Sequence, residues 1–186
     1  MAFTRRELIK HAGTLGLFGI GGGLTRLARA ANQRFIAWHN WAGNQACIPE
    51  VRTAPENEAA LAELLRSTKS NIRAVGSGHS FSALVPTDGT LLSLSNMTGM
   101  ISADAQTMQS EFWGGTRMSE MGEPLLKAGL ALPNMSDIDY QTLAGAISTS
   151  THGTGPKFGS YSTTVVGLRL VTANGDILDL DKDHHP

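Results

Sequence analysis

The sequence has 186 residues, of which 41% are hydrophobic and 17% charged, and this composition is typical of one globular domain. Residues 1–30 contain five Lys or Arg and one acidic residue, a charge of about +4, so the total of -1 leaves about -5 on the remainder. An acidic remainder argues against nucleic-acid binding, which needs clustered positive charge. The single cysteine, Cys47, excludes an internal disulfide and cysteine-based metal centres, and we expect it to be a small buried apolar residue. The sequence predicts no metal site.

Residues 1–30 have the features of an export signal. Arg5 and Arg6 are followed by Leu8, Ile9 and Lys10, an order that fits the twin-arginine pattern. The apolar stretch over 11–24 is too short and too rich in glycine to span a membrane, and an Ala-Arg-Ala sequence at 28–30 offers a cleavage site. We therefore predict a twin-arginine signal peptide, transfer to the periplasm by the export machinery, and no stable membrane span. An amphipathic N-terminal helix is the alternative.

The first part of the mature chain predicts alternating strands and helices. Residues 49–75 read as strand, helix and strand, and the helix has acidic residues first and basic residues last, as its dipole favours. Another strand is expected over 90–95, and one or two short strands within 100–113. A helix is expected around 118–128, where Pro124 must begin or break it.

The second part adds a helix and a hairpin. Small residues over 142–149 predict a helix beside a polar loop, and residues 165–180 predict a β-hairpin. The Asn174-Gly175 pair at its centre suits a two-residue type I′ turn. The sequence stops shortly after this hairpin, with no helix to cover the sheet. We therefore expect an α+β domain over 31–186 that is truncated at its C-terminal side.

Two loops rich in glycine and hydroxyl groups are candidate ligand sites. Residues 76–82 (G-S-G-H-S-F-S) directly follow a predicted strand, and successive N–H groups in such a loop can bind an anion such as a pyrophosphate. An ordinary tight turn is the alternative. Residues 133–139 and 142–155 offer many hydroxyl and backbone donors for a polyanionic or heterocyclic ligand. A solvated surface loop is the alternative there.

Three segments together resemble a known family: R-A-V-G-S-G-H-S-F-S, then L-P-N-M-S-D-I-D, then A-G-A-I-S-T-S-T-H-G-T-G. They are similar to the FAD-binding domain of the vanillyl-alcohol-oxidase superfamily (the PCMH type). The nearest branch is that of the aldonolactone and alditol oxidases, which are gulonolactone oxidase-like, and W-H-N-W-A-G-N-Q at 38–45 resembles the start of that branch. The resemblance covers residues 35–180 and implies the fold of this domain.

The resemblance also implies roles for matching positions. Residues 73–82 would surround the FAD pyrophosphate, and His79 stands where many members join a histidine to the flavin 8α-methyl carbon. Ile177 matches a position that often touches the adenine through its backbone, whereas His152 could equally be a structural hydrogen-bonder. The implied cofactor-binding residues are Arg73, Gly76, Ser77, Gly78, His79, Ser80, Phe81, Ser136, Asp137, Thr142, Gly145, Ala146, Thr149, His152 and Ile177.

The implied function is FAD-dependent oxidation of a sugar lactone or alditol at a CH–OH carbon. Electrons would pass to oxygen or another acceptor, and the sugar or polyol is a small-molecule partner. The catalytic residues are expected in a C-terminal half that these 186 residues lack. Two alternatives stay open. One is a non-catalytic, truncated flavin-binding module. The other is a different FAD enzyme that shares the domain, such as the cell-wall precursor reductase, whose cytoplasmic location conflicts with the export signal.

Overall fold

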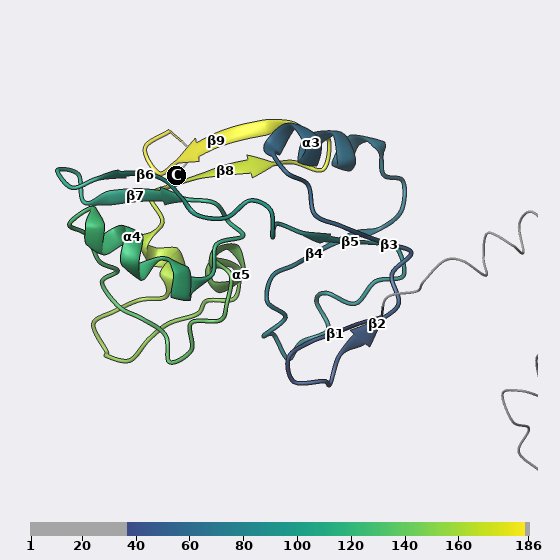
Figure 1. Cartoon of the computed structure of the whole chain (residues 1–186), viewed down its shortest axis with the longest axis horizontal. Helices are drawn as coiled ribbons and strands as arrows, with labels where there is room; N and C mark the ends of the chain where they lie inside the picture. The colour runs from purple at the N-terminus through teal and green to yellow at the C-terminus, as the bar shows by residue number, and fades with distance from the viewer. Residues whose placement is uncertain (1–36, 185–186) are drawn as a thin grey trace, which may run out of the picture. The chain divides into compact units, whose positions relative to one another are not determined.

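The structure is a computed structural model that describes residues 37–184 (Figure 1). The features described below belong to the unit Phe35–Pro186. The predicted signal peptide over 1–30 lies outside the described residues. Between residues 37 and 184, no helix is both long and apolar enough to span a bilayer.

A small parallel sheet follows the predicted strand–helix–strand unit. β3 (Val51–Thr53), β5 and β4 (Ile72–Val75) lie in the order β3-β5-β4, and α3 (Glu58–Ser67) connects β3 to β4. β5 (Thr90–Ser93) is central, and its first three residues are buried. A central strand that is apolar and covered on both sides is typical of parallel pairing. The predictions over 49–75 and 90–95 are therefore confirmed.

Local capping explains where α3 begins. The Asn57 side chain accepts a hydrogen bond of 2.9 Å from the Ala60 backbone N–H, which satisfies one of the free amides at the helix start. Glu58 stands in the first turn and Arg66 in the last, as the helix dipole favours. Leu61 is buried, so the apolar stripe of the helix faces the interior. The short stretch therefore forms a stable helix through both its cap and its packing.

A short hairpin precedes this sheet. β1 (Trp38–His39) pairs antiparallel with β2 (Ala46–Cys47), and residues 40–45 form the turn between them. Trp38 is buried, whereas Cys47 is half-buried and has a free thiol. The expectation of a buried Cys47 is therefore only partly correct.

The middle of the chain forms a second hairpin and two short helical segments. β6 (Met100–Asp104) pairs antiparallel with β7 (Gln109–Phe112), which confirms the short strands predicted within 100–113. The helix predicted around 118–128 is divided into a 3-10 turn, η1 (Met118–Glu120), and α4 (Gly122–Lys127). Pro124 lies in the first turn of α4, where its missing N–H breaks no hydrogen bond, so it begins the helix and does not kink it.

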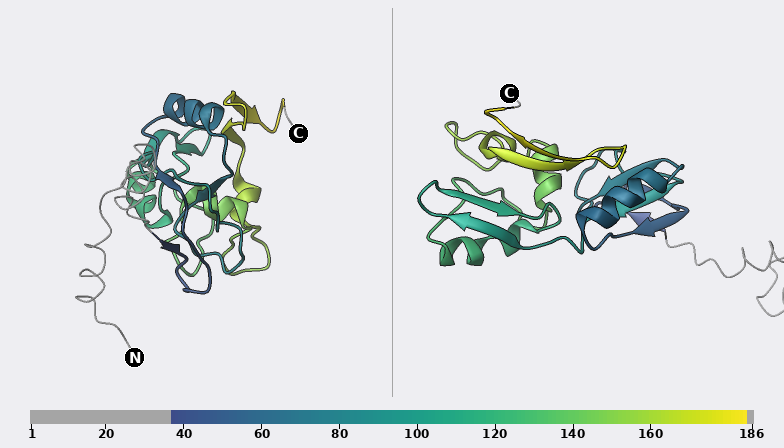
Figure 2. Two further views of the ribbon diagram at one scale, coloured as in Figure 1. Left: turned by 90° about the vertical axis from the view of Figure 1, so that its right-hand side faces the viewer. Right: turned by 90° about the horizontal axis from the view of Figure 1, so that it is seen from above.

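The helix predicted over 142–149 is present as α5 (Leu143–Ser148), and the 3-10 turn η2 (Tyr161–Thr164) packs beside it. Figure 2 shows both segments from two further sides. They share a hydrophobic core with η1 and α4, and side chains from all four segments meet there. Its buried members are Met118, Met121, Leu125, Leu130, Ala146 and Tyr161.

The last hairpin has a different turn from the one predicted. β8 (Gly167–Val171) pairs antiparallel with β9 (Ile177–Asp181), so the hairpin itself is confirmed. Its loop has five residues, the Gly175 N–H donates to the Thr172 carbonyl over 2.9 Å, and Gly175 has a φ of +77°. Asn174 has no positive φ, which a type I′ turn requires. The loop is instead a type I turn followed by one left-handed residue, and the prediction of a type I′ turn is wrong.

Polar contacts attach this hairpin to α3. The Arg169 guanidinium lies 2.7 Å from Asp179 on the neighbouring strand and 3.2 Å from Glu58 at the start of α3. Hydrogen bonds to Asp179 and then Glu58 raise the pKa of Arg169 above its ordinary value. At the other end of the helix, the Arg66 side chain donates to the Gly175 carbonyl over 3.1 Å. The hairpin is therefore held along the length of α3.

Candidate functional site

The loop over 76–82 leaves β4 with unpaired backbone donors. Between residues 37 and 184, no acceptor is hydrogen-bonded to the backbone N–H groups of Ser77, Gly78, His79 or Ser80. Gly78 has a φ of +72°, the left-handed conformation that turns successive N–H groups toward a common point. A run of unsatisfied amides in such a turn binds an anion well. The anion-binding loop predicted from the sequence is therefore available in the structure.

Gly78 is favoured at its position by its positive φ, which disfavours a side chain. A Cβ atom there would lie 3.4 Å from Trp38 and 3.5 Å from the Asn40 backbone, which are ordinary contacts. The loop thus lies directly on the turn between β1 and β2, and the Trp41 N–H donates to the Gly78 carbonyl over 2.9 Å. The carbonyl of the loop is consequently held by the turn while its amides stay free.

The structure brings the second predicted segment to this loop. The Ser77 hydroxyl donates to the Tyr140 carbonyl over 2.5 Å. Gly76 lies against the Thr142 side chain, which leaves no room for a Cβ atom at position 76. The Tyr140 ring stacks on the His79 ring with 6.4 Å between their centroids. The loop over 76–82 and residues 140–142 therefore form one site.

The start of α5 contributes fewer free backbone N–H groups to this site than its sequence suggests. Thr142 is the N-cap residue of the helix, but the next two amides are already used. The Leu143 N–H donates to the Thr116 carbonyl over 2.8 Å, and the Ala144 N–H donates to the Gly114 carbonyl over 2.9 Å. These bonds anchor the helix to the segment after β7. Anion binding in this site therefore depends on the loop over 76–82.

Three further predicted residues lie within or at the end of α5. The Ala146 side chain is fully buried in the hydrophobic core, so this residue positions the helix by packing. A Cβ atom at Gly145 would lie 3.2 Å from the Thr142 hydroxyl, which makes this a close approach within the site. The Thr149 hydroxyl donates to the Gly145 carbonyl over 2.8 Å and so caps the helix at its C-terminal end.

Ser136 and Asp137 precede this helix in an irregular segment. The Ser136 N–H donates to the Tyr161 hydroxyl over 2.7 Å, and the Ser136 hydroxyl donates to the Ile138 carbonyl. Asp137 is exposed. Tyr161 is buried, and the sequence prediction did not include it. A tyrosine six residues after the glycine- and hydroxyl-rich segment over 142–155 was the signal that could have identified this support.

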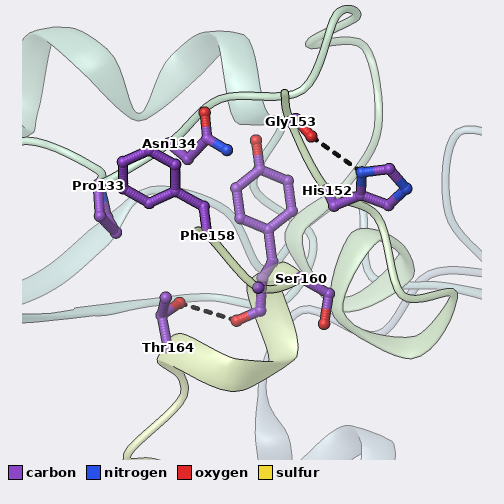
Figure 3. A pocket seen from close by; sticks show the side chains of 9 residues that line it. Pro133, Asn134, His152, Gly153, Phe158, Ser160 and Thr164 are labelled. Carbon is purple, nitrogen blue, oxygen red and sulfur yellow. Dashed lines mark hydrogen bonds between the residues drawn. The ribbon is translucent and has the colours of Figure 1, made fainter. Parts of the chain in front are cut away.

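His152 lies in a separate small pocket (Figure 3). Its Nδ1 atom is 2.9 Å from the Gly153 carbonyl oxygen, and the ring is exposed. Within residues 37–184, no hydrogen bond or ring contact joins His152 to the loop over 76–82. This hydrogen bond to the neighbouring Gly153 supports a structural role for His152, which the sequence analysis gave as an alternative. The pocket is lined by Pro133, Asn134, His152, Gly153, Phe158, Gly159, Ser160, Tyr161 and Thr164.

Arg73, Phe81 and Ile177 are the remaining predicted residues. Arg73 is an exposed residue of β4 that precedes the loop, and Phe81 is an exposed residue within it. Ile177 begins β9, pairs with Val171 and is exposed. In the described part of the chain, no hydrogen bond joins Ile177 to the loop over 76–82. The contact of Ile177 with the cofactor stays a prediction.

Two aromatic residues beside His79 were missing from the prediction. The Trp41 ring stacks on the His79 ring with a centroid distance of 5.2 Å and an interplanar angle of 21°. The Tyr140 ring, at 22°, stacks on it as well. The W-H-N-W-A-G-N-Q segment was noted only for its resemblance, and its two tryptophans were the signal that could have pointed to an aromatic contact.

Comparison with known proteins identifies the family of this chain. Residues 49–181 match the family described as FAD binding domain. The chain is 38% identical over 148 residues to an L-gulono-1,4-lactone dehydrogenase of Mycobacterium tuberculosis, a match that covers 78% of this chain and 35% of the relative. It is 34% identical over 147 residues to an L-gulonolactone oxidase of Bos taurus, with 77% of this chain and 33% of the relative covered. The chain thus spans about a third of the length of these curated relatives.

Solved structures agree with this fold. A 6-hydroxy-D-nicotine oxidase from Arthrobacter nicotinovorans matches with a TM-score of 0.69 at 20% identity, covering 82% of this chain and 37% of that one. A solvent-stable cholesterol oxidase matches with a TM-score of 0.62 at 26% identity, covering 77% and 31%. These structures support the α+β fold that the sequence predicted.

Proposed function

Because the chain belongs to the FAD binding domain family, in the aldonolactone oxidase branch of the vanillyl-alcohol-oxidase superfamily, we propose that it forms the cofactor-binding part of an FAD-dependent oxidoreductase. The substrate class that we propose is a sugar lactone or alditol, oxidised at a CH–OH carbon. The lactone dehydrogenase and lactone oxidase names of the relatives support the sugar lactone.

The site fits the cofactor. FAD carries a pyrophosphate, and the unpaired N–H groups of residues 77–80 offer donors for it. The positive φ of Gly78 turns successive N–H groups toward a common point, and the missing side chain at Gly76 lets the loop pack against Thr142. When bound, FAD accepts a hydride from the substrate carbon and passes the electrons to oxygen or another acceptor. The observation that carries the proposal is this run of free amides beside His79.

We also propose that His79 holds the flavin covalently. Its ring is half-buried beside the free amides, so an imidazole nitrogen lies next to the proposed pyrophosphate loop. Forming the bond replaces one C–H bond of the flavin 8α-methyl and one N–H bond of His79 by a C–N bond. The two protons and two electrons released pass to dioxygen, which becomes hydrogen peroxide. Such a bond would keep the cofactor in the protein.

The test is anaerobic reduction of the flavin. The full chain is purified with FAD, and its visible flavin absorption is followed after addition of L-gulono-1,4-lactone, D-arabinono-1,4-lactone or an alditol. We expect a sugar lactone to bleach the flavin. A chain that binds FAD but is bleached by none of these compounds is a cofactor-binding module without turnover, which is the second candidate function. A chain that binds no FAD contradicts the proposal.

Export is a further part of the proposal. The Arg5-Arg6 pair supports recognition by twin-arginine export machinery, which carries folded, cofactor-loaded proteins to the periplasm. Replacing both arginines by lysine keeps the charge but removes the pattern. We expect the Arg5→Lys/Arg6→Lys variant to stay in the cytoplasmic fraction, whereas the native chain should be recovered from the periplasm. Equal periplasmic recovery of the two would contradict it.

A further inference from the structure

The His79 ring is in contact with two large aromatic rings. The Trp41 ring is stacked on it at a centroid distance of 5.2 Å, and the Tyr140 ring at 6.4 Å, with interplanar angles of 21° and 22°. Trp41 is 68% exposed and Tyr140 is 62% exposed, so neither is held there by burial in a core. Since exposed aromatic side chains gain little from such a position by themselves, their shared contact with one imidazole needs a reason.

Trp41 belongs to a turn that holds the backbone on both sides of His79. The Trp41 N–H donates to the Gly78 carbonyl over 2.9 Å. The Asn40 side chain donates to the Ser80 carbonyl over 2.9 Å and is only 1% exposed. The residues before and after His79 are therefore both hydrogen-bonded to consecutive residues of this turn. The turn consequently fixes the position from which the His79 side chain leaves the backbone.

The turn is itself held rigid by amide side chains. The Asn40 side chain donates to the Asn44 side chain over 2.7 Å and accepts from the Gln45 N–H over 3.0 Å. The Asn44 and Gln45 side chains both donate to the Phe81 carbonyl, over 3.1 Å and 3.3 Å. A buried amide with all of these bonds made is costly to disturb, so the Trp41 ring has a fixed platform.

The stacked rings limit how the imidazole can bond. The lone pair of an imidazole nitrogen lies in the plane of the ring, so a ring that cannot tilt can form a new bond only within that plane. A ring stacked on the imidazole opposes tilting, because the two rings would lose contact or collide. A small error in the placement of a reacting atom slows a reaction strongly.

We propose that Trp41 is a positioning residue, which fixes the plane of the His79 imidazole for covalent attachment of the flavin. This inference rests on the proposed function, since it requires FAD to bind beside His79. Tyr140 also stacks on the ring, and Asn40 holds the turn that carries Trp41. The W-H-N-W-A-G-N-Q segment would therefore position the His79 ring, a role distinct from pyrophosphate binding by the loop over 76–82.

The experiment measures the rate of attachment in the full chain. The purified chain is mixed with FAD in air, samples are denatured in SDS at intervals, and the flavin fluorescence of the protein band is recorded. We expect Trp41→Ala to slow the appearance of this fluorescence by about tenfold or more. Trp41→Phe restores a flat ring and is expected to stay within about threefold of the native rate. Leu126→Ala is the control, because it removes an exposed side chain of α4 and should change the rate by less than about twofold.

A second measurement separates attachment from binding. In a His79→Ala background no bond can form at this position, so equilibrium dialysis reports non-covalent FAD binding alone. Adding Trp41→Ala there should change the dissociation constant by less than about threefold, because Trp41 acts on the histidine and not on the pyrophosphate loop. Should Trp41→Ala fail to fold, Tyr140→Ala carries the test through the second stacked ring, with the same expected slowing.

The outcomes distinguish the two proposals. Attachment by the Trp41→Ala variant at the native rate overturns the positioning role. A native chain that binds FAD but acquires no SDS-stable flavin overturns the linkage and this role together, while leaving the cofactor site intact. A native chain that binds no FAD contradicts the proposed function itself.

Discussion

Gly76 lies against the side chain of Thr142, although the two residues belong to different segments of the site. A Cβ atom at position 76 would collide with the Thr142 hydroxyl oxygen but would lie 3.5 Å from the Thr142 Cβ, an ordinary contact. Only the hydroxyl therefore excludes a side chain at position 76. This contact joins the loop after β4 to the N-cap residue of α5. It predicts that a side chain at position 76 lowers stability and that removing the Thr142 hydroxyl restores it.

We expect Gly76→Ala to destabilise the chain by about 1–3 kcal/mol, because the added methyl group must displace the Thr142 hydroxyl. The double variant Gly76→Ala/Thr142→Ala should recover most of this loss, since it removes the atom that collides. Urea unfolding of the native chain, both single variants and the double variant forms a complete cycle. A double variant no more stable than Gly76→Ala would mean that the hydroxyl is not the obstacle.

Tyr161 supports the segment over 133–139 through its hydroxyl group. The hydroxyl accepts from the Ser136 N–H over 2.7 Å, and the residue is buried. Tyr161→Phe leaves this amide without a partner, and we expect a loss of about 1–2 kcal/mol in unfolding free energy. Tyr140→Phe is the matched control, because Tyr140 is exposed and should change the free energy by less than about 0.5 kcal/mol. Equal losses of unfolding free energy in Tyr161→Phe and Tyr140→Phe would contradict a supporting role for the Tyr161 hydroxyl.

The turn of the last hairpin predicts a contrast between two neighbours. Gly175 has a φ of +77°, and a Cβ atom there would lie 2.6 Å from the Ala62 carbonyl oxygen. Gly175→Ala should lower the unfolding free energy by about 2 kcal/mol or more through strain and collision together. Asn174→Ala should change it by less than about 0.5 kcal/mol, since Asn174 has an ordinary φ. A larger loss of unfolding free energy in Asn174→Ala than in Gly175→Ala would contradict this turn assignment and favour a type I′ turn.

The ion pair between Arg169 and Glu58 should contribute little to stability. The two side chains are 38% and 24% exposed, so solvent screens their attraction. A double-mutant cycle with Arg169→Met and Glu58→Gln should give a coupling of less than about 1 kcal/mol, and added salt should reduce it. A coupling well above this value, unaffected by salt, would identify a desolvated pair.

The sequence predicted elements whose cause is local. A short leucine-rich segment indicated β5, and the loop over 76–82 is predicted directly after a strand, where the structure has it. Dipole-favoured charges indicated α3. These features depend on neighbours in the chain, so composition and spacing carry them. Pro124 was also informative, because its place in the first turn follows from its missing N–H.

The rest depended on contacts between distant segments. The Asn174-Gly175 pair suggested a two-residue turn, but the register of β8 and β9 left five residues in the loop. The stacking of Trp41 and Tyr140 on His79 could not be read from spacing, because it brings together the β1–β2 turn, the loop after β4 and the segment before α5. Likewise, the use of the first α5 amides by Thr116 and Gly114 required the fold.

The central claim is that the free amides of residues 77–80 bind the pyrophosphate of FAD. Equilibrium dialysis of the full chain against FAD and against riboflavin, which has no phosphate, tests it most directly. Two charge-assisted hydrogen bonds correspond to roughly a hundredfold in affinity, so FAD should bind about a hundredfold more tightly than riboflavin, and ADP should compete with it. Riboflavin binding as tightly as FAD, with no competition from ADP, would contradict the account.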